Sequence, residues 1–144
     1  MDETYDPLAL QNQLCFPLYV ASKELTRRYK PFLDPLGLTY TQYVTMMALW
    51  EEDHIPVKEL GERLYLDSAT LTPLLKRLEA KGYITRQRSE QDERSVIISL
   101  TGAGQSLREQ ALSVPACMGD CLHLDAEDAL ALKVLLEKLL ASMD

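Results

Sequence analysis

The chain has 144 residues, 47% of them hydrophobic, and a formal net charge of −7, which suits one compact domain and excludes an intrinsically disordered chain. No uninterrupted apolar run approaches the ~20 residues that a membrane-spanning helix needs. The acidic N-terminal stretch MDETYDPLAL lacks the pattern of a secretory signal, so we expect a cytoplasmic protein with no membrane partner.

The first third of the chain predicts two helices. Residues 8–33 carry apolar side chains at spacings of three and four, which is the period of an amphipathic helix. Pro17 interrupts this pattern, so we expect either a kink or a fresh start there. Residues 35–37, Pro-Leu-Gly, end the segment, and a second helix should run from Thr39 to the charged turn at residues 51–53.

The middle of the chain predicts a helix, a short turn, a second helix and a β-hairpin. Residues 57–64 form a short amphipathic pattern, and Asp67 and Ser68 offer a cap for a helix over 68–81 that ends before Gly82. Residues 84–88 and 95–100 are β-prone and flank a polar turn. This order is typical of a winged helix-turn-helix, so we predict a mainly α fold with a two-stranded hairpin as its wing. The second helix should bury Leu71, Leu74, Leu75 and Leu78.

The last third returns to helix. Thr101 is a suitable cap for a helix running towards Cys117, and Asp125 should start another that reaches Met143. The final helix has a wide apolar stripe, and with residues 8–34 it presents more apolar surface than a small reading head can cover. A second copy of the chain could cover this surface; the alternative is that both helices pack on the domain's own core.

The predicted second helix and hairpin carry groups suited to double-stranded DNA. Although the chain is acidic overall, residues 57–100 hold eight basic and seven acidic side chains, so this stretch is +1 and the remainder is −8. Hydroxyls at the start of a recognition helix can reach base edges, and cations further along can reach phosphates. Arginines around an exposed turn can enter the minor groove. The candidate residues are Ser68, Thr70, Thr72, Lys76, Arg77 and Lys81 on the helix and Arg86, Arg88 and Arg94 on the hairpin.

The run from Leu66 to Glu79 (LDSATLTPLLKRLE), followed by Asp92-Glu93-Arg94 and Leu100-Thr101, resembles the MarR family of winged-helix repressors. Residues 14–19, 29–31 and 38–43 are similar to the organic-hydroperoxide sensors of that family, the OhrR group. The resemblance implies one domain over 1–144 that binds a pseudo-palindromic operator as a homodimer. Residues 57–101 would bind DNA, with Asp92 orienting Arg94, and residues 8–34 and 102–143 would form the dimerisation helices.

The same resemblance assigns a reactive thiol to Cys15. In such sensors an organic hydroperoxide oxidises this cysteine, Tyr29 and Tyr40 hydrogen-bond to its sulfur, and the repressor leaves DNA. A reactive thiol must be partly thiolate, and phenolic donors favour the charged form. Tyr19 lies one helical turn from Cys15, whereas fourteen residues at ~1.5 Å each place Tyr29 about 21 Å away along a straight helix. If Tyr29 serves Cys15, it must therefore come from a second subunit.

The two remaining cysteines leave the route of oxidation open. One-cysteine sensors end at a sulfenic acid or a mixed disulfide with a small thiol, whereas two-cysteine sensors use a resolving cysteine of the partner chain. The resemblance makes Cys117 the candidate resolving thiol and Cys121 its reserve. Although His123 lies close by in sequence, no second pair of ligands follows, so we expect no metal and no cofactor.

Two other functions remain open at this point. One is a MarR-type repressor that a small aromatic ligand releases from DNA. The other is a thiol peroxidase, although the chain has no recognisable peroxidase motif. A peroxidase would turn over steadily with a reductant, so a reaction that stops after one event would exclude it. We predict a regulator and not an enzyme.

Overall fold

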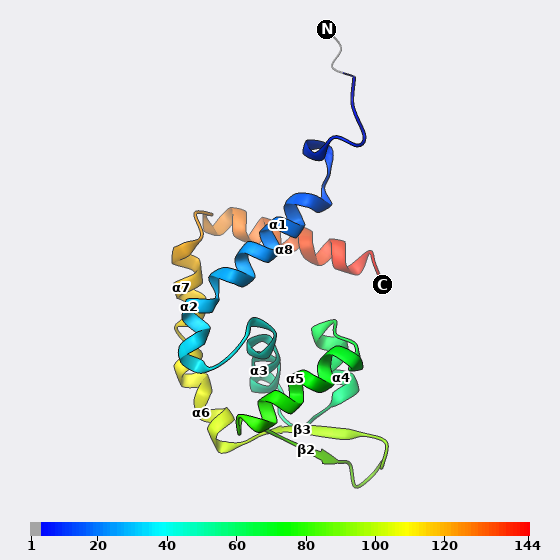
Figure 1. Ribbon diagram of the computed structural model, residues 1–144, viewed down its shortest axis with the longest axis vertical. Coiled ribbons are helices and arrows are strands. Elements are labelled where there is room, and N and C mark those ends of the chain that lie inside the picture. The colour runs from blue at the N-terminus through cyan, green and yellow to red at the C-terminus, as the bar shows by residue number, and fades with distance from the viewer. Residues whose placement is uncertain (1–3) are drawn as a thin grey trace. The chain divides into compact units, whose positions relative to one another are not determined.

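The computed structural model describes residues 4–144, which form two compact units, one ending at Val114 and the other running from Pro115 to Asp144 (Figure 1). The single domain that the sequence suggests over 1–144 stays a prediction. Among residues 4–144, no helix is both long and apolar enough to cross a bilayer. The helices and strands are η1 (Leu10–Asn12), α1 (Cys15–Arg28), α2 (Lys30–Leu33), η2 (Asp34–Leu36), α3 (Tyr40–Glu51), β1 (Ile55–Pro56), α4 (Val57–Leu64), α5 (Ser68–Ala80), β2 (Ile84–Arg88), β3 (Val96–Leu100), α6 (Gly102–Ala111), α7 (Val114–Cys121) and α8 (Ala126–Ala141).

The winged helix-turn-helix is confirmed, with one strand more than the sequence predicts. Helices α4 and α5 form the helix-turn-helix, and β2 and β3 pair antiparallel from Ile84 opposite Leu100 to Arg88 opposite Val96. The third strand, β1, pairs with β3 through Ile55 opposite Ile98, so the order is β1-β3-β2. A two-residue strand that contains a proline has no period of its own, which is why sequence patterns miss it.

The two long helices expected near the ends of the chain are each divided. The segment 8–33 consists of η1, α1 and α2, and α1 begins at Cys15, so Pro17 lies in its first turn, where a missing N–H costs no helical hydrogen bond. The helix expected from Thr101 towards Cys117 breaks after Ala111 and resumes at Val114. By contrast, Asp125 caps α8 as predicted, with its side chain accepting from the Asp128 N–H at 2.8 Å.

The core of the first unit lies between α3, α5 and the sheet. Trp50 of α3 donates from Nε1 to the Gly104 carbonyl of α6 at 2.9 Å. Gly104 packs so closely that a Cβ there would collide with the Tyr83 carbonyl. The hydrophobic side chains exposed by 1% or less are Leu33, Met46, Leu49, Ile55, Leu60, Leu71, Leu75, Leu78, Ile84 and Ile98. Because all four leucines predicted for α5 are buried, its opposite face is left for solvent or a ligand.

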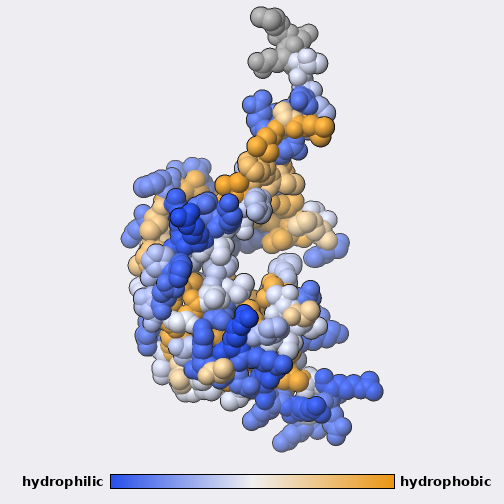
Figure 2. Space-filling model, viewed as in Figure 1, coloured by the Kyte–Doolittle hydropathy of each residue, from blue (hydrophilic) through white to orange (hydrophobic). Residues whose placement is uncertain are grey.

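The two end helices, α1 and α8, bury no residue in the chain. Figure 2 shows hydrophobic surface along the start of α1 and the segment before it, where Leu8 is 90% and Leu14 74% exposed. On α8, Leu130 and Leu135 are 63% and 62% exposed. Apolar side chains in this number on exposed helices are typical of a protein interface.

Candidate nucleic-acid interface and reactive cysteine

The exposed face of α5 carries the predicted polar groups. Asp67 caps the helix, because its Oδ1 accepts from the Thr70 N–H at 2.8 Å. Leucines fill the opposite face, so the structure exposes Ser68, Thr70, Lys76 and Arg77 and leaves Thr72 half-buried. Hydroxyls at the start of the helix and cations further along can thus face one ligand together. Lys81 differs, because its Nζ donates to Gln42 Oε1 at 2.8 Å and to the Gly37 carbonyl.

The cap at Asp67 gives a pH-dependent expectation. Hydrogen bonds from Thr70 hold the pKa of the Asp67 carboxyl below its usual value. A lowered native pKa stabilises the fold above the unfolded pKa, and this contribution is lost as the pH falls through the native pKa. Asp67→Ala should therefore lower the free energy of unfolding at pH 7, and the difference from wild type should shrink at about pH 3. Urea unfolding at both pH values measures this; Glu62→Ala, an exposed carboxylate inside α4, should show a smaller loss at pH 7.

The hairpin ends in an ordered turn with exposed arginines. The Asp92 carboxylate accepts from the Arg94 N–H at 3.0 Å, and Ser89 N–H donates to the Ser95 carbonyl at 2.8 Å. Asp92 thus shapes the backbone at Arg94. Arg88 and Arg94 are both exposed, and the hairpin end is strongly hydrophilic in Figure 2. The turn therefore presents cations away from the core.

Arg86 is the hairpin arginine that the structure holds against α5. Its Nε lies 3.5 Å from Glu79 Oε1, its backbone N–H donates to Glu79 Oε2 at 3.2 Å, and its side chain is only 27% exposed. We therefore assign Arg86 to holding the wing on the recognition helix. The sequence carries no signal for this role of Glu79, because nothing in the local pattern ties a helix carboxylate to a strand seven residues later.

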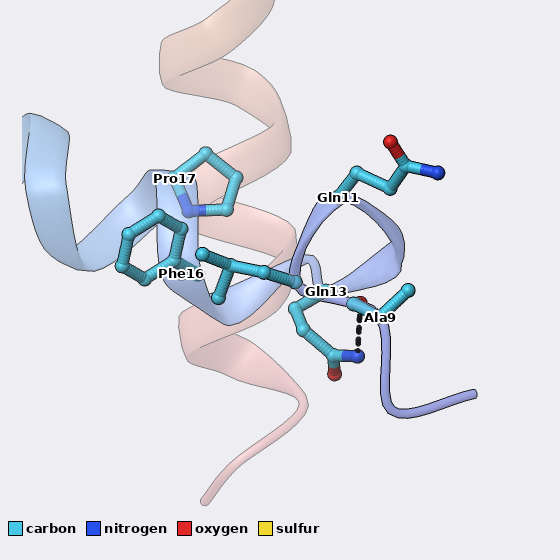
Figure 3. Close-up of a pocket in the computed structure, with 6 residues that line it drawn as sticks. Ala9, Gln11, Gln13, Phe16 and Pro17 are labelled. Atoms are coloured by element: carbon cyan, nitrogen blue, oxygen red, sulfur yellow. Dashed lines mark hydrogen bonds between the residues drawn. The ribbon is translucent and has the colours of Figure 1, made fainter. Parts of the chain in front are cut away.

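Cys15 is the first residue of α1 and is exposed. Beside it lies a shallow groove of about 600 Å³, lined by η1 and the start of α1 (Figure 3). Phe16 and Pro17 form one side of this groove and Gln13 the other, with the Gln13 amide donating to the Ala9 carbonyl at 2.8 Å. Apolar side chains therefore form part of the groove next to Cys15 in the chain. The other residues lining the groove are Leu10 and Gln11.

Three tyrosines form a cluster at the far end of α1. The Tyr29 ring centroid lies 4.9 Å from that of Tyr40 and 5.8 Å from that of Tyr43. Burial first, and the neighbouring Tyr40 second, raise the pKa of the Tyr29 phenol, so it stays a hydrogen-bond donor at neutral pH. Tyr43 completes the cluster. Its spacing of three residues from Tyr40 on the same helix is the signal in the sequence that indicates it.

The structure separates Cys15 from the tyrosine cluster of the same chain. Helix α1 runs from Cys15 to Arg28, which at ~1.5 Å per residue is roughly 20 Å. Tyr19 is one turn from Cys15 but is 64% exposed, with Lys23 Nζ 5.9 Å from its ring centroid.

The two remaining thiols belong to α7. Cys117 and Cys121 are both half-buried and lie four residues apart, so they sit on the same face of one helix. Their position relative to Cys15 within a dimer stays a prediction. Among residues 4–144, no group of three or more His, Cys, Asp or Glu side chains is placed to hold a metal ion.

Comparison with known proteins assigns the family. The family model of the transcriptional regulators SarA and Rot matches residues 27–111. The organic hydroperoxide resistance transcriptional regulator of Bacillus subtilis (strain 168) is 50% identical over 143 residues, covering 99% of this chain and 97% of that protein.

Solved structures of similar fold belong to transcriptional regulators as well. Reduced AbfR of Staphylococcus epidermidis bound to DNA is 36% identical, with a TM-score of 0.82 and coverage of 93% of this chain and 92% of that chain. Disulfide-formed AbfR has a TM-score of 0.68 at the same identity, covering 94% and 93%. A MarR transcriptional regulator from Methanosarcina mazei Go1 is 27% identical, with a TM-score of 0.75 and coverage of 86% and 96%. The exposed face of α5 and the ordered hairpin agree with the regulators to which the chain is similar, none of which is named as an enzyme. The chain therefore belongs to the MarR family of winged-helix transcriptional regulators, in the group of organic hydroperoxide resistance regulators.

Proposed function

We propose that this protein is a DNA-binding repressor that leaves its operator when an organic hydroperoxide oxidises Cys15. The observation that carries the DNA part is the joint exposure of the α5 hydroxyls and cations with the hairpin arginines. A relative of 36% identity has been solved bound to DNA, which supports this use of the surface. Ser68, Thr70 and Thr72 would approach base edges in the major groove, and Lys76 and Arg77 the phosphates.

The hairpin would place Arg94 of its turn and Arg88 at the end of β2 in the minor groove. Arg94→Ala should weaken DNA binding and reduce the slope of log affinity against log salt by about 1. Arg27→Ala removes the same charge from an exposed side chain of α1 and should leave both quantities close to wild type. Fluorescence anisotropy at several salt concentrations provides the measurement, and equal slopes for wild type and Arg94→Ala would contradict the assignment.

The sensing chemistry begins at the Cys15 sulfur. The thiolate attacks one oxygen of the hydroperoxide; the S–O bond forms as the O–O bond breaks, and the alkoxide takes a proton and leaves as an alcohol. The sulfur is oxidised to a sulfenic acid and the peroxide is reduced. The apolar groove beside Cys15 favours an organic substituent on that peroxide. The name of the Bacillus subtilis relative supports this effector.

Cys15 and its phenolic donors require two copies of the chain. The tyrosine cluster lies roughly 20 Å along α1 from the cysteine of its own chain, whereas α1 and α8 expose apolar faces that a second copy would cover. A two-fold dimer would bring Tyr29 and Tyr40 of one subunit to Cys15 of the other and would match a pseudo-palindromic operator.

Oxidation would end in one of two ways. The sulfenic acid can condense with the thiol of Cys117, or in reserve Cys121, of the partner subunit, forming an S–S bond and releasing water. Otherwise a small thiol takes the place of the protein thiol and gives a mixed disulfide. The solved disulfide-formed state of AbfR supports the first route.

One titration tests the proposal as a whole. Reduced wild-type protein is used to select DNA from a random duplex pool, and its affinity for the selected duplex is measured before and after cumene hydroperoxide. Intact mass under non-reducing conditions is recorded on the same samples. We expect release of DNA together with an intersubunit disulfide. Unchanged affinity after oxidation would refute peroxide sensing, and an added mass on the single chain without crosslinking would assign the small-thiol route.

A further inference from the structure

The corner that leads into α3 holds one member of the tyrosine cluster in place. This η2–α3 corner comprises residues 34–42 and passes through Gly37 in the left-handed region, at φ 68°. Thr39 and Gln42 form a reciprocal cap: Gln42 N–H donates to Thr39 Oγ1 at 3.3 Å, and Thr39 N–H donates to Gln42 Oε1 at 3.1 Å. Tyr40 lies between them as the first residue of α3. A movement of Tyr40 therefore moves this corner.

Lys81, at the end of the recognition helix, is hydrogen-bonded to the same corner. It is the C-cap residue of α5, and its Nζ donates to Gln42 Oε1 at 2.8 Å and to the Gly37 carbonyl. The Gln42 side chain is buried, with 3% exposure. Its amide oxygen thus receives two donors, one from the corner itself and one from α5. A buried acceptor that loses its donor is costly, so corner and helix end are held together.

A second contact joins the same two segments. Tyr83 follows α5 directly, and its N–H donates to the Leu78 carbonyl at 3.1 Å, which fixes it to the end of that helix. Its hydroxyl donates to the Leu36 carbonyl of η2 at 3.2 Å. Three hydrogen bonds, two from Lys81 and one from Tyr83, therefore connect residues at and just after the C-terminal end of α5 to residues 36–42.

We propose that Lys81 is a positioning residue that couples the Tyr29–Tyr40 pair to the recognition helix. This inference rests on the proposed function, in which oxidation of Cys15 changes what Tyr29 and Tyr40 contact. Displacement of Tyr40 shifts the η2–α3 corner, and the Lys81 ammonium carries that shift to the end of α5. Tyr83 supports the same link through its hydroxyl. The role of Lys81 is thus to make DNA affinity depend on the state of Cys15, and contact with phosphate is not required.

The test compares Lys81→Met with Lys76→Met, which removes the same charge from an exposed site on α5. For each variant the DNA affinity is measured in the reduced state and after cumene hydroperoxide, together with the rate of loss of the Cys15 thiol. When two sites in a protein are coupled, the state of one commonly changes the binding affinity at the other by about 5- to 150-fold. We expect wild type and Lys76→Met to share one ratio of reduced to oxidised affinity within that range. Lys81→Met should oxidise at the wild-type rate but show a ratio close to 1.

Two more variants guard against a purely structural effect. Lys81→Arg keeps a cationic donor and should restore the ratio. Tyr83→Phe removes one hydroxyl and should lower the ratio partway, which keeps the test valid if Lys81→Met fails to fold. Equal ratios for Lys81→Met and wild type, with both affinities of the variant lowered alike, would overturn the coupling role in favour of phosphate contact. Failure of wild type itself to release DNA would instead refute the proposed sensing function.

Discussion

Replacement of Cys15 by serine is expected to abolish the response to organic hydroperoxide while leaving DNA binding intact. Serine keeps the size and the hydrogen bonding of the side chain but cannot form the thiolate that attacks the peroxide. The residue lies at the exposed start of α1, outside the core and outside α5 and the hairpin. Wild type should lose affinity by about 5- to 150-fold on oxidation, and Cys15→Ser should lose none.

The control for this experiment keeps Cys15 and removes the other two thiols. Cys117→Ser/Cys121→Ser should still react with peroxide, because the attacking sulfur is present, but it should form no intersubunit disulfide. Anisotropy with the selected duplex gives the affinities, and non-reducing intact mass gives the products. A Cys15→Ser protein that still leaves DNA after peroxide would show that another group senses the oxidant.

The second large effect is expected from a mixed dimer. One chain carries Cys15→Ser and the other carries Tyr29→Phe with Tyr40→Phe, both in the Cys117→Ser/Cys121→Ser background. If each site combines the cysteine of one subunit with the tyrosines of the other, the mixed dimer holds one complete site, because the chain with Cys15 faces the chain with both phenols. If each site lies within one chain, every site in the mixed dimer is damaged.

The rate of Cys15 oxidation distinguishes these arrangements. A hydrogen bond to a charged group stabilises that group by about 1.5–3 kcal/mol. Loss of the phenols that would stabilise the Cys15 thiolate should therefore slow the oxidation of Cys15 by at least roughly tenfold. We expect the homodimer with both phenylalanine substitutions to react at this slow rate and the mixed dimer to react at the wild-type rate with one thiol. Trapping of the sulfenic acid with dimedone, followed by mass spectrometry, measures both. A slow mixed dimer would contradict the intersubunit site.

Local patterns in the sequence predicted the features that depend on neighbours along the chain. The leucine spacing of α5 and the cap at Asp67 predicted that helix, and the alternation after Ser95 predicted the strand of the wing. The cap at Thr101 and the helix starts near Thr39 and Asp125 were likewise predicted, since a cap is a contact over two or three residues. The resemblance of residues 14–19, 29–31 and 38–43 to the hydroperoxide sensors then indicated Cys15, Tyr29 and Tyr40 as candidate site residues.

Contacts between side chains that are far apart in the chain became known from the folded structure alone. It paired β1 with β3, held Arg86 against Glu79, turned Lys81 from α5 towards Gln42, and added Tyr43 to the ring cluster. None of these contacts has a period or a fixed spacing in sequence, because each depends on how separate elements pack. The structure also shows that α1 runs without a break from Cys15 to Arg28, which places the cysteine and the tyrosine cluster roughly 20 Å apart along that helix. This separation is the reason why the site that we propose combines two copies of the chain.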